Sequence, residues 1–141
     1  MYARGRRRAD GVRPPICRTA YGRRMRILEI ESKPLRGAPC VAVAGELDVA
    51  GVPELERTLD AAIADSTGAF LIDLCELEFV DSSGIRALLR VRALLGREAR
   101  ALALICPPGP VLRALDLVGV SDLFTTYATR DEAACALVPP G

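Results

Sequence analysis

The sequence predicts a single α/β domain with a mixed, mainly parallel sheet of about four to five strands and about four helices. The chain has 141 residues, half of them apolar, which is enough for one compact core. Aromatic residues are few and Trp is absent, so the core must consist of aliphatic side chains, which suits helices packed on a buried sheet. Short apolar runs alternate with amphipathic segments, the pattern of strands joined by right-handed helical crossovers.

The start of the chain differs in composition from the rest. Residues 1–26 hold nine arginines and one aspartate, a net charge of +8, whereas residues 27–141 hold ten basic and seventeen acidic residues, a net charge of −7. The early segment has no apolar period, and we expect it to be disordered. It is either a basic arm for nucleic acid or an acidic partner, or a non-native addition before Met25, which we favour. The expected boundaries are a basic extension at 1–24, the folded domain at 25–138 and a tail at 139–141.

The first half of the folded part predicts two strands and a helix. Residues 26–31 are typical of an edge strand, and a turn is expected at 34–39. Residues 40–44 form a short apolar run that Gly45 should end. Residues 52–64 follow with a helical period, and their apolar stripe consists of Val52, Leu55, Leu59, Ala62 and Ile63, with Pro53 in the first turn.

The second half repeats this alternation three times. Residues 69–74 and 101–106 are apolar runs typical of buried parallel strands. Between them a helix is predicted over 82–95, with Gly96 as its stop. Its expected inner stripe is Ile85, Leu88, Leu89 and Leu95. The remaining predictions are a helix from Pro110 to Gly119, a strand at 123–127 and a helix at 131–137 capped by Thr129.

The absence of histidine removes most enzymatic mechanisms. It excludes Ser-His-Asp and Cys-His catalysis, HExxH proteases and most mixed zinc sites, and no P-loop or GxSxG pattern occurs. We therefore expect no enzyme, metal or cofactor. The cysteines stand singly and are interpreted as reduced thiols, mostly within the core: Cys17, Cys40, Cys75, Cys106 and Cys135. No long apolar window or secretory signal is visible, so we expect a cytoplasmic protein without membrane contact.

The segment Asp81-Ser82-Ser83-Gly84 stands where the strand at 70–74 and its exit loop at 75–80 lead into a helix. In open α/β sheets, binding and modification sites gather at the carboxyl ends of strands. Ser82 would lie in the cap or first turn, where backbone N–H groups accommodate a phosphate, and Gly84 would let another backbone approach closely. Taken alone, such a quartet most often does no more than cap a helix.

The context of this quartet resembles a known family. The run from Leu71 to Ile85 is similar to the signature of STAS-domain anti-sigma factor antagonists, a strand of the type hydrophobic-hydrophobic-Asp-Leu leading to Phe-(Val/Met/Ile)-Asp-Ser-(Ser/Thr)-Gly. Three further segments resemble family blocks in the same order, and the resemblance extends over about Met25 to Val138. They are Gly45-Glu46-Leu47-Asp48, the stretch from Val111 to Phe124, and Arg130-Asp131-Glu132-Ala133-Ala134.

The resemblance implies a regulator that binds an anti-sigma factor with a GHKL-type kinase fold and so releases a sigma factor. That partner would phosphorylate Ser82, and a PP2C-type phosphatase would reverse the reaction. The chain would thus be a substrate and no catalyst, without direct nucleic-acid or membrane binding, and a monomer or weak dimer. The expected partner-binding residues are Asp48, Asp81, Ser82, Ser83, Gly84 and Arg86.

Several alternatives stay open at the level of the sequence. The same fold could serve as a scaffold or accessory subunit of a stressosome-like or lipid-transport assembly. An enzymatic reading would make Ser82 a nucleophile with an aspartate as base, with Lys33 as the nearest lysine. Asp48 could be a turn residue and Asp81 a helix cap, and Ser83 is more typical of a structural residue. The stripe of Arg86, Arg90 and Arg97 either faces a partner or is a solvated helix face.

Overall fold

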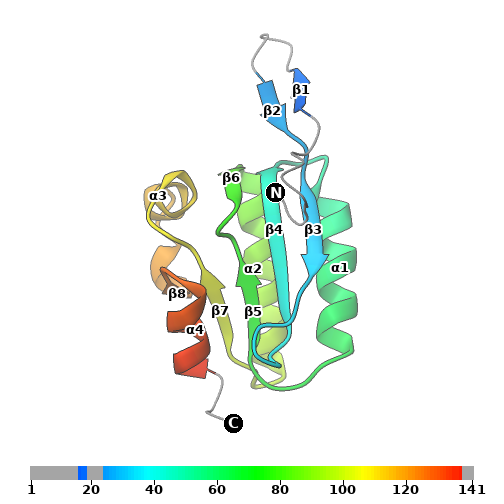
Figure 1. Cartoon of the computed structure of the whole chain (residues 1–141), viewed down its shortest axis with the longest axis vertical. Helices are drawn as coiled ribbons and strands as arrows, with labels where there is room; N and C mark the ends of the chain where they lie inside the picture. The colour runs from blue at the N-terminus through cyan, green and yellow to red at the C-terminus, as the bar shows by residue number, and fades with distance from the viewer. Residues whose placement is uncertain (1–15, 19–23, 138–141) are drawn as a thin grey trace.

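The computed structural model describes residues 16–18 and 24–137, and its centre is a six-stranded sheet (Figure 1). The strands run in the order β3, β4, β5, β7 and β8, and β6 pairs with the far end of β4. Only β3 is antiparallel to its neighbour, which confirms the predicted mixed, mainly parallel α/β fold. Their bounds are β3 Glu29–Ser32, β4 Cys40–Leu47, β5 Phe70–Asp73, β6 Leu77–Val80, β7 Leu102–Ile105 and β8 Thr125–Tyr127.

Four α-helices surround the sheet, as predicted. Helices α1 (Val52–Ala64) and α2 (Ser82–Arg97) cover one face, and α4 (Arg130–Leu137) packs on the other. Helix α3 (Pro110–Leu117) lies against β6, and a 3₁₀ turn follows it at Ser121–Leu123. The Thr129 hydroxyl accepts a hydrogen bond from the Glu132 N–H at 3.1 Å, which confirms Thr129 as the cap of α4. No helix within 16–18 and 24–137 is long and apolar enough to cross a membrane.

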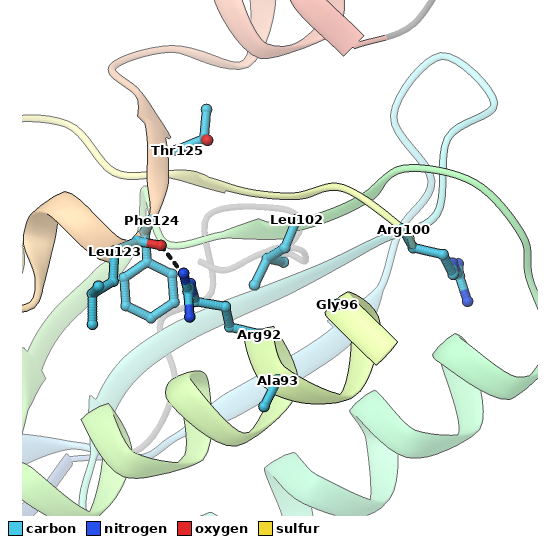
Figure 2. A pocket seen from close by; sticks show the side chains of 8 residues that line it. All are labelled: Arg92, Ala93, Gly96, Arg100, Leu102, Leu123, Phe124 and Thr125. Atoms are coloured by element: carbon cyan, nitrogen blue, oxygen red, sulfur yellow. Dashed lines mark hydrogen bonds between the residues drawn. The ribbon is translucent and has the colours of Figure 1, made fainter. Parts of the chain in front are cut away.

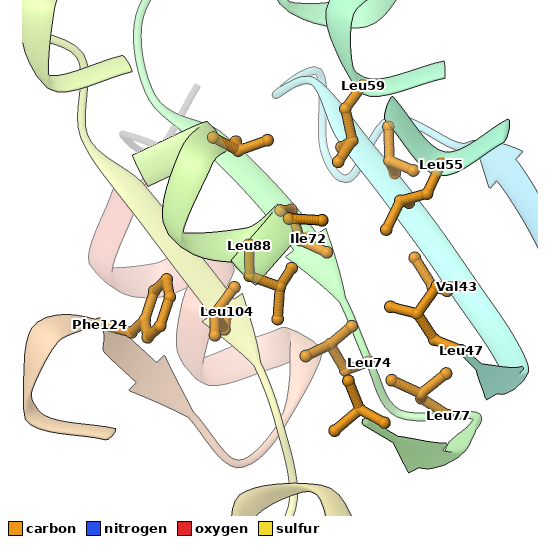
Figure 3. Packing of buried hydrophobic residues seen from close by; sticks show 14 of the residues in the cluster. Val43, Leu47, Leu55, Leu59, Ile72, Leu74, Leu77, Leu88, Leu104 and Phe124 are labelled. Atoms are coloured by element: carbon orange, nitrogen blue, oxygen red, sulfur yellow. The ribbon is translucent and has the colours of Figure 1, made fainter. Parts of the chain in front are cut away.

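The main core lies between the sheet and the pair α1 and α2 (Figure 3). Leu55, Leu59 and Ile63 of α1 are buried, in agreement with the predicted stripe. In α2 the buried side includes Val91, which was not expected, whereas Leu89 is only partly buried. The sheet contributes the opposing side chains Val41, Val43, Leu47, Phe70, Ile72 and Leu104.

Two strand predictions were wrong because side-chain patterns alone do not show how β4 ends. Gly45 does not end β4, which continues to Leu47. At Gly45 φ is +93°, and a Cβ would lie 2.4 Å from the Ile27 carbonyl oxygen. The register shifts between Gly45 and Glu46, so that the end of β4 turns from β5 to β6. Strand β6 occupies residues expected to form an exit loop, and its Leu77 and Val80 are buried.

Two further boundaries differ from the sequence expectation. The stop of α2 is not Gly96: the helix runs to Arg97, and the left-handed residue is Ala99 at φ +56°. The first strand expected at 26–31 is divided into β2 (Arg24–Arg26) and β3. Strand β2 pairs with β1 (Ile16–Arg18), so part of the segment expected to be disordered forms a two-stranded sheet. Residues 1–15 and 19–23 lie outside the described residues, as does the tail at 139–141.

Candidate functional site

The ends of β4 and β6 lie side by side and bring two predicted site segments together. Leu47 and Val80 are partners in the parallel register, and the Asp81 N–H donates to the Leu47 carbonyl at 3.2 Å. Asp48 and Asp81 therefore follow directly from adjacent strand ends. The turn after β4 therefore lies next to the start of α2.

Asp81 is the N-cap of α2. Its backbone is extended, and its Oδ1 accepts hydrogen bonds from the Gly84 N–H at 3.1 Å and the Ser83 hydroxyl at 2.6 Å. Partial burial raises the pKa of this carboxyl, but hydrogen bonds from Ser83, Gly84 and the backbone of Val49 outweigh it, and the net pKa is lowered. Asp81 thus carries a full negative charge at neutral pH and joins the turn after β4 to α2.

The two serines of the quartet occupy different environments. Ser82 is the first residue of α2 and is exposed, and its hydroxyl makes no hydrogen bond with any residue that the structure describes. Ser83 is half-buried, and its hydroxyl is committed to Asp81. The geometry therefore separates an available hydroxyl from a structural one, as the sequence suggested.

Gly84 allows α2 to begin directly on the ends of the strands. A Cβ at this position would lie 2.7 Å from Val80 Cγ2 and 2.9 Å from two Leu47 carbons. The expectation of a close backbone was wrong in its detail, because the atoms that approach Gly84 are buried side chains. Any larger residue would push the first turn of α2, and Ser82 with it, away from the sheet.

Asp48 stabilises the turn between β4 and α1. Its Oδ1 accepts the Ala50 N–H at 3.1 Å, and its carbonyl accepts the Gly51 N–H at 3.0 Å. No hydrogen bond joins Asp48 to Ser82 among the residues described in the structure. Asp48 therefore affects the candidate site through the position of Val49, whose backbone hydrogen bond helps to lower the pKa of Asp81.

A comparison of the sequence with known protein families shows to which family this chain belongs. The model of the family described as "STAS domain" matches residues 29–133. This range includes β3, the Asp81 cap and most of the described chain. The chain belongs to the STAS domain family. This confirms the resemblance seen in the sequence, and the quartet lies within the matched region.

Curated relatives of this STAS domain are named as antagonists of anti-sigma factors. The anti-sigma-F factor antagonist RsfB of Mycobacterium tuberculosis is 25% identical over 97 residues, 69% of this chain and 79% of that protein. The anti-sigma-B factor antagonist of Staphylococcus aureus is 30% identical over 84 residues, 60% of this chain and 78% of that protein. Both names describe antagonists of an anti-sigma factor.

Solved structures agree with the fold of the STAS domain. An anti-sigma factor antagonist from Mycobacterium paratuberculosis superposes with a TM-score of 0.72 at 31% identity, over 79% of this chain and 94% of that one. The antagonist SpoIIAA in its unphosphorylated form has a TM-score of 0.61 at 24% identity, over 76% and 92% of the two chains, and supports the fold alone.

The basic stripe on α2 of this STAS domain divides into two kinds of residue. Arg90 pairs with α1, through Nε to Glu56 at 3.1 Å and a terminal nitrogen to Asp60 at 2.7 Å. The hydrogen bond to Asp60 is the largest cause of its raised pKa. Arg86, one turn after Ser82, is exposed and forms no ion pair with the described residues. Arg86 is therefore available to a partner, whereas Arg90 is committed to α1.

Exposed apolar side chains near the quartet were not identified from the sequence. Val49, in the turn that contacts Asp81, is 70% exposed, and Phe79, two residues before Asp81, is 36% exposed. Leu117 at the end of α3 is 82% exposed. Single apolar residues in loops and at helix ends carry no periodic signal, so only the structure shows that two of them lie next to the site.

Other chemistry in the STAS domain is sparse. The described residues contain no group of three or more potential metal ligands. Burial is the largest cause that raises the pKa of Cys40 and Cys75 to about 12 and of Cys106 to about 11. A cavity of about 360 Å³ lies beside the second half of α2, where Arg92 Nε donates to the Leu123 carbonyl at 2.6 Å (Figure 2). None of its lining residues belongs to the quartet.

Proposed function

We propose that this chain is an anti-sigma factor antagonist that is switched off by phosphorylation of Ser82. In the active state it binds an anti-sigma factor through the sheet end formed by the Asp48 turn and the start of α2, and a sigma factor is released. The names of the curated relatives support the antagonist role. The observation that carries the switch is the exposed Ser82 hydroxyl, which has no hydrogen-bond partner among residues 16–18 and 24–137 and comes directly after the Asp81 cap.

The start of α2 accommodates a phosphate on Ser82 without unfolding the domain. Ser82 is the first residue of a 16-residue helix, whose first N–H groups and dipole favour a negative group. Asp81 uses the Gly84 N–H, but other N–H groups of the first turn have no partner within the helix. The modification would therefore act on binding and leave the fold intact.

Negative charge at the rim opposes docking of the partner. A phosphoserine adds about −1.5 to −2 charges, next to an Asp81 carboxylate that is already ionised and close to the Asp48 turn. Two unit charges about 4 Å apart interact by roughly 4 kcal/mol at an effective dielectric near 20. Since about 1.4 kcal/mol is a tenfold change in affinity, one phosphate is enough to abolish a micromolar contact.

The surface around Ser82 indicates what the partner presents. Val49 and Phe79 offer apolar contact area, and the ionised Asp81 favours a basic rim on the partner. Arg86 supplies one positive group to an otherwise acidic site. We propose that the partner is an anti-sigma factor with a GHKL-type kinase fold, which would transfer phosphate to Ser82. A PP2C-type phosphatase would remove this phosphate.

The test uses the native partner and two serine variants. The tagged chain captures its partner from cell extract, and the complex is then incubated with ATP. We expect phosphate on Ser82 of the wild type and of Ser83→Ala, and neither phosphate nor release in Ser82→Ala. Phosphate uptake by Ser82→Ala at the wild-type rate would move the acceptor to another residue.

Affinity provides a second measurement that needs no kinase activity. Ser82→Asp and Ser82→Glu place a fixed charge on the first residue of α2, and we expect at least about tenfold weaker binding by calorimetry. Ser82→Asn introduces a polar side chain of the same size as Asp but without the charge, and this variant should bind like the wild type. Equal affinity of the Asp and Asn variants would rule out the electrostatic switch.

A further inference from the structure

The sheet has a second face, and over β3 and β4 its composition is unusual. Ile30, Val41 and Val43 point into the core beneath α1 and α2. Because side chains alternate along a strand, the residues between them point to the other side. The register places Glu29 beside Ala44 and Glu31 beside Ala42. We name this surface the β3–β4 face, and it consists of Glu29, Glu31, Ala42, Ala44 and Glu46.

Only half of this side of the sheet is covered by a helix. Over β5 and β7, Leu71 and Ile105 are fully buried and pack in one cluster with Ala133 of α4. Over β3 and β4 no helix of the described chain lies in front of the sheet, as Figure 1 shows. Ala42 and Ala44 are half-buried, and Glu31 is exposed. The β3–β4 face is therefore a shallow surface with small residues at its centre and carboxylates around them.

The first described strands, β1 and β2, precede β3 at the edge of this face. Ile16 of β1 pairs with Arg26 of β2, and Arg26 lies three residues before Glu29. The Arg26 guanidinium forms an ion pair with Glu78 of β6, which ties β2 to the sheet. Ile16, to which the segment 1–15 is joined, is therefore paired close to the start of β3. It holds five arginines and one aspartate, a net charge of +4.

We propose that the segment 1–15 of this same chain docks on the β3–β4 face. Its guanidinium groups would pair with Glu29 and Glu31, and the small side chains of Ala42 and Ala44 would let its backbone approach the sheet. Fifteen residues reach up to about 50 Å, far more than the length of a strand. A short tether also gives an effective concentration of about millimolar, so the segment outcompetes a separate basic partner for this face.

Trypsin measures this docking in the full chain, because Arg4, Arg6, Arg7 and Arg8 are cleavage sites. We expect the double variant Glu29→Gln and Glu31→Gln to be cleaved in the stretch from Arg4 to Arg8 at least about threefold faster than the wild type at about 0.1 M salt. At about 1 M salt, where screening is nearly complete, both proteins should be cleaved at the same rate. The released peptides are counted by mass spectrometry.

A matched variant removes two charges elsewhere. Asp116 and Asp122 are exposed and lie outside the β3–β4 face, and their double change to Asn should leave the cleavage rate as in the wild type. Equal rates in all three proteins at low salt would overturn the proposal. Protection that rises with protein concentration would also overturn it, because the segment would then occupy the face of a second copy.

A spectroscopic readout keeps the proposal testable if the glutamate variant folds poorly. In the full chain, Arg4, Arg6 and Arg7 are changed to Gln, and we expect shifts of the Ala42 and Ala44 amide resonances. The same three-charge change at Arg57, Arg97 and Arg113, which are exposed on helices, should leave these amides unmoved. Shifts confined to the Asp48 turn and Ser82 would place the segment at the other site and refute docking on the β3–β4 face.

Discussion

Asp73 and Asp81 both stand at the carboxyl end of a strand of the same sheet, but they do different things. Asp73 ends β5 in the middle of the sheet and is 5% exposed. Its carboxylate accepts Arg130 Nε at 2.6 Å and the Cys75 N–H at 2.9 Å. Asp81 follows β6 at the rim and is half-buried, and within the described part of the chain it accepts hydrogen bonds only from its own turn and from the backbone of Val49.

The difference separates a structural carboxylate from a site carboxylate. At Asp73 the charge is neutralised by a cation from α4, and this pair ties the last helix to the central strand. At Asp81 the charge has no cation among the described residues, and the next residue presents an exposed hydroxyl. Position at a strand end thus does not mark a site. The site that we propose differs from Asp73 in having an unpaired charge, within the described residues, beside an exposed hydroxyl.

The largest expected effect tests the structural carboxylate. Arg130→Ala leaves the buried Asp73 charge without its cation, and we expect the free energy of unfolding to fall by about 2–3 kcal/mol, less than for a fully buried pair because Arg130 is half exposed. Denaturant titration measures it. Arg36→Ala removes the exposed pair with Asp131 near the same helix and should cost at most about 0.5 kcal/mol. Equal losses would make the Asp73 pair an ordinary surface contact.

The next effect tests how α2 is seated at the site. Gly84→Ala forces the buried Leu47 and Val80 side chains to move, at a cost of about 1–3 kcal/mol, and displaces Ser82. We therefore expect weaker partner binding as well as a lower melting temperature. Gly96→Ala on the same helix meets nothing within 4 Å and should be neutral or stabilising by up to about 1 kcal/mol. Unchanged stability of the Gly84 variant would show that the contact is easily relieved.

Sequence reasoning succeeded where local pattern decides the structure. Helix α1 was predicted with its observed bounds because a clear apolar stripe follows Pro53. The position of Ser82 in the first turn of α2 followed from the order of strand and helix, and the cap at Asp81 was one of the two alternatives that the sequence left open. Strand β6 was missed because Glu78 interrupts its short apolar run, and its pairing depends on the distant Gly45 bulge. The Asp73–Arg130 pair joins residues 57 positions apart, which no local period reveals.

Substitution of the cap residue Asp81 is expected to lower stability less than Gly84→Ala does, but to weaken partner binding strongly. Asp81→Ala removes the acceptor for Gly84 and Ser83, and we expect a loss of about 1 kcal/mol. Partner binding should fall at least about tenfold, because the Val49 turn loses its link to α2. Ser83→Ala loses one bond to Asp81 and should keep phosphate uptake at Ser82. Normal binding by Asp81→Ala would reduce Asp81 to a cap without a functional role.

The smallest expected effect is the pH dependence that Asp81 confers. Hydrogen bonds lower its pKa in the folded state below the usual 3.8, so its ionised form is preferred by the folded chain. A lowered pKa contributes stability above the unfolded-state value and loses it as the pH falls through the folded-state value. Asp81→Asn keeps a capping side chain but no charge. The stability difference between wild type and this variant should be constant from pH 7 to about 5, below about 1 kcal/mol, and shrink below about pH 4. A difference that grew on acidification would mean that the folded state prefers the protonated carboxyl, and Asp81 would then resemble a desolvated acid instead of a charged cap.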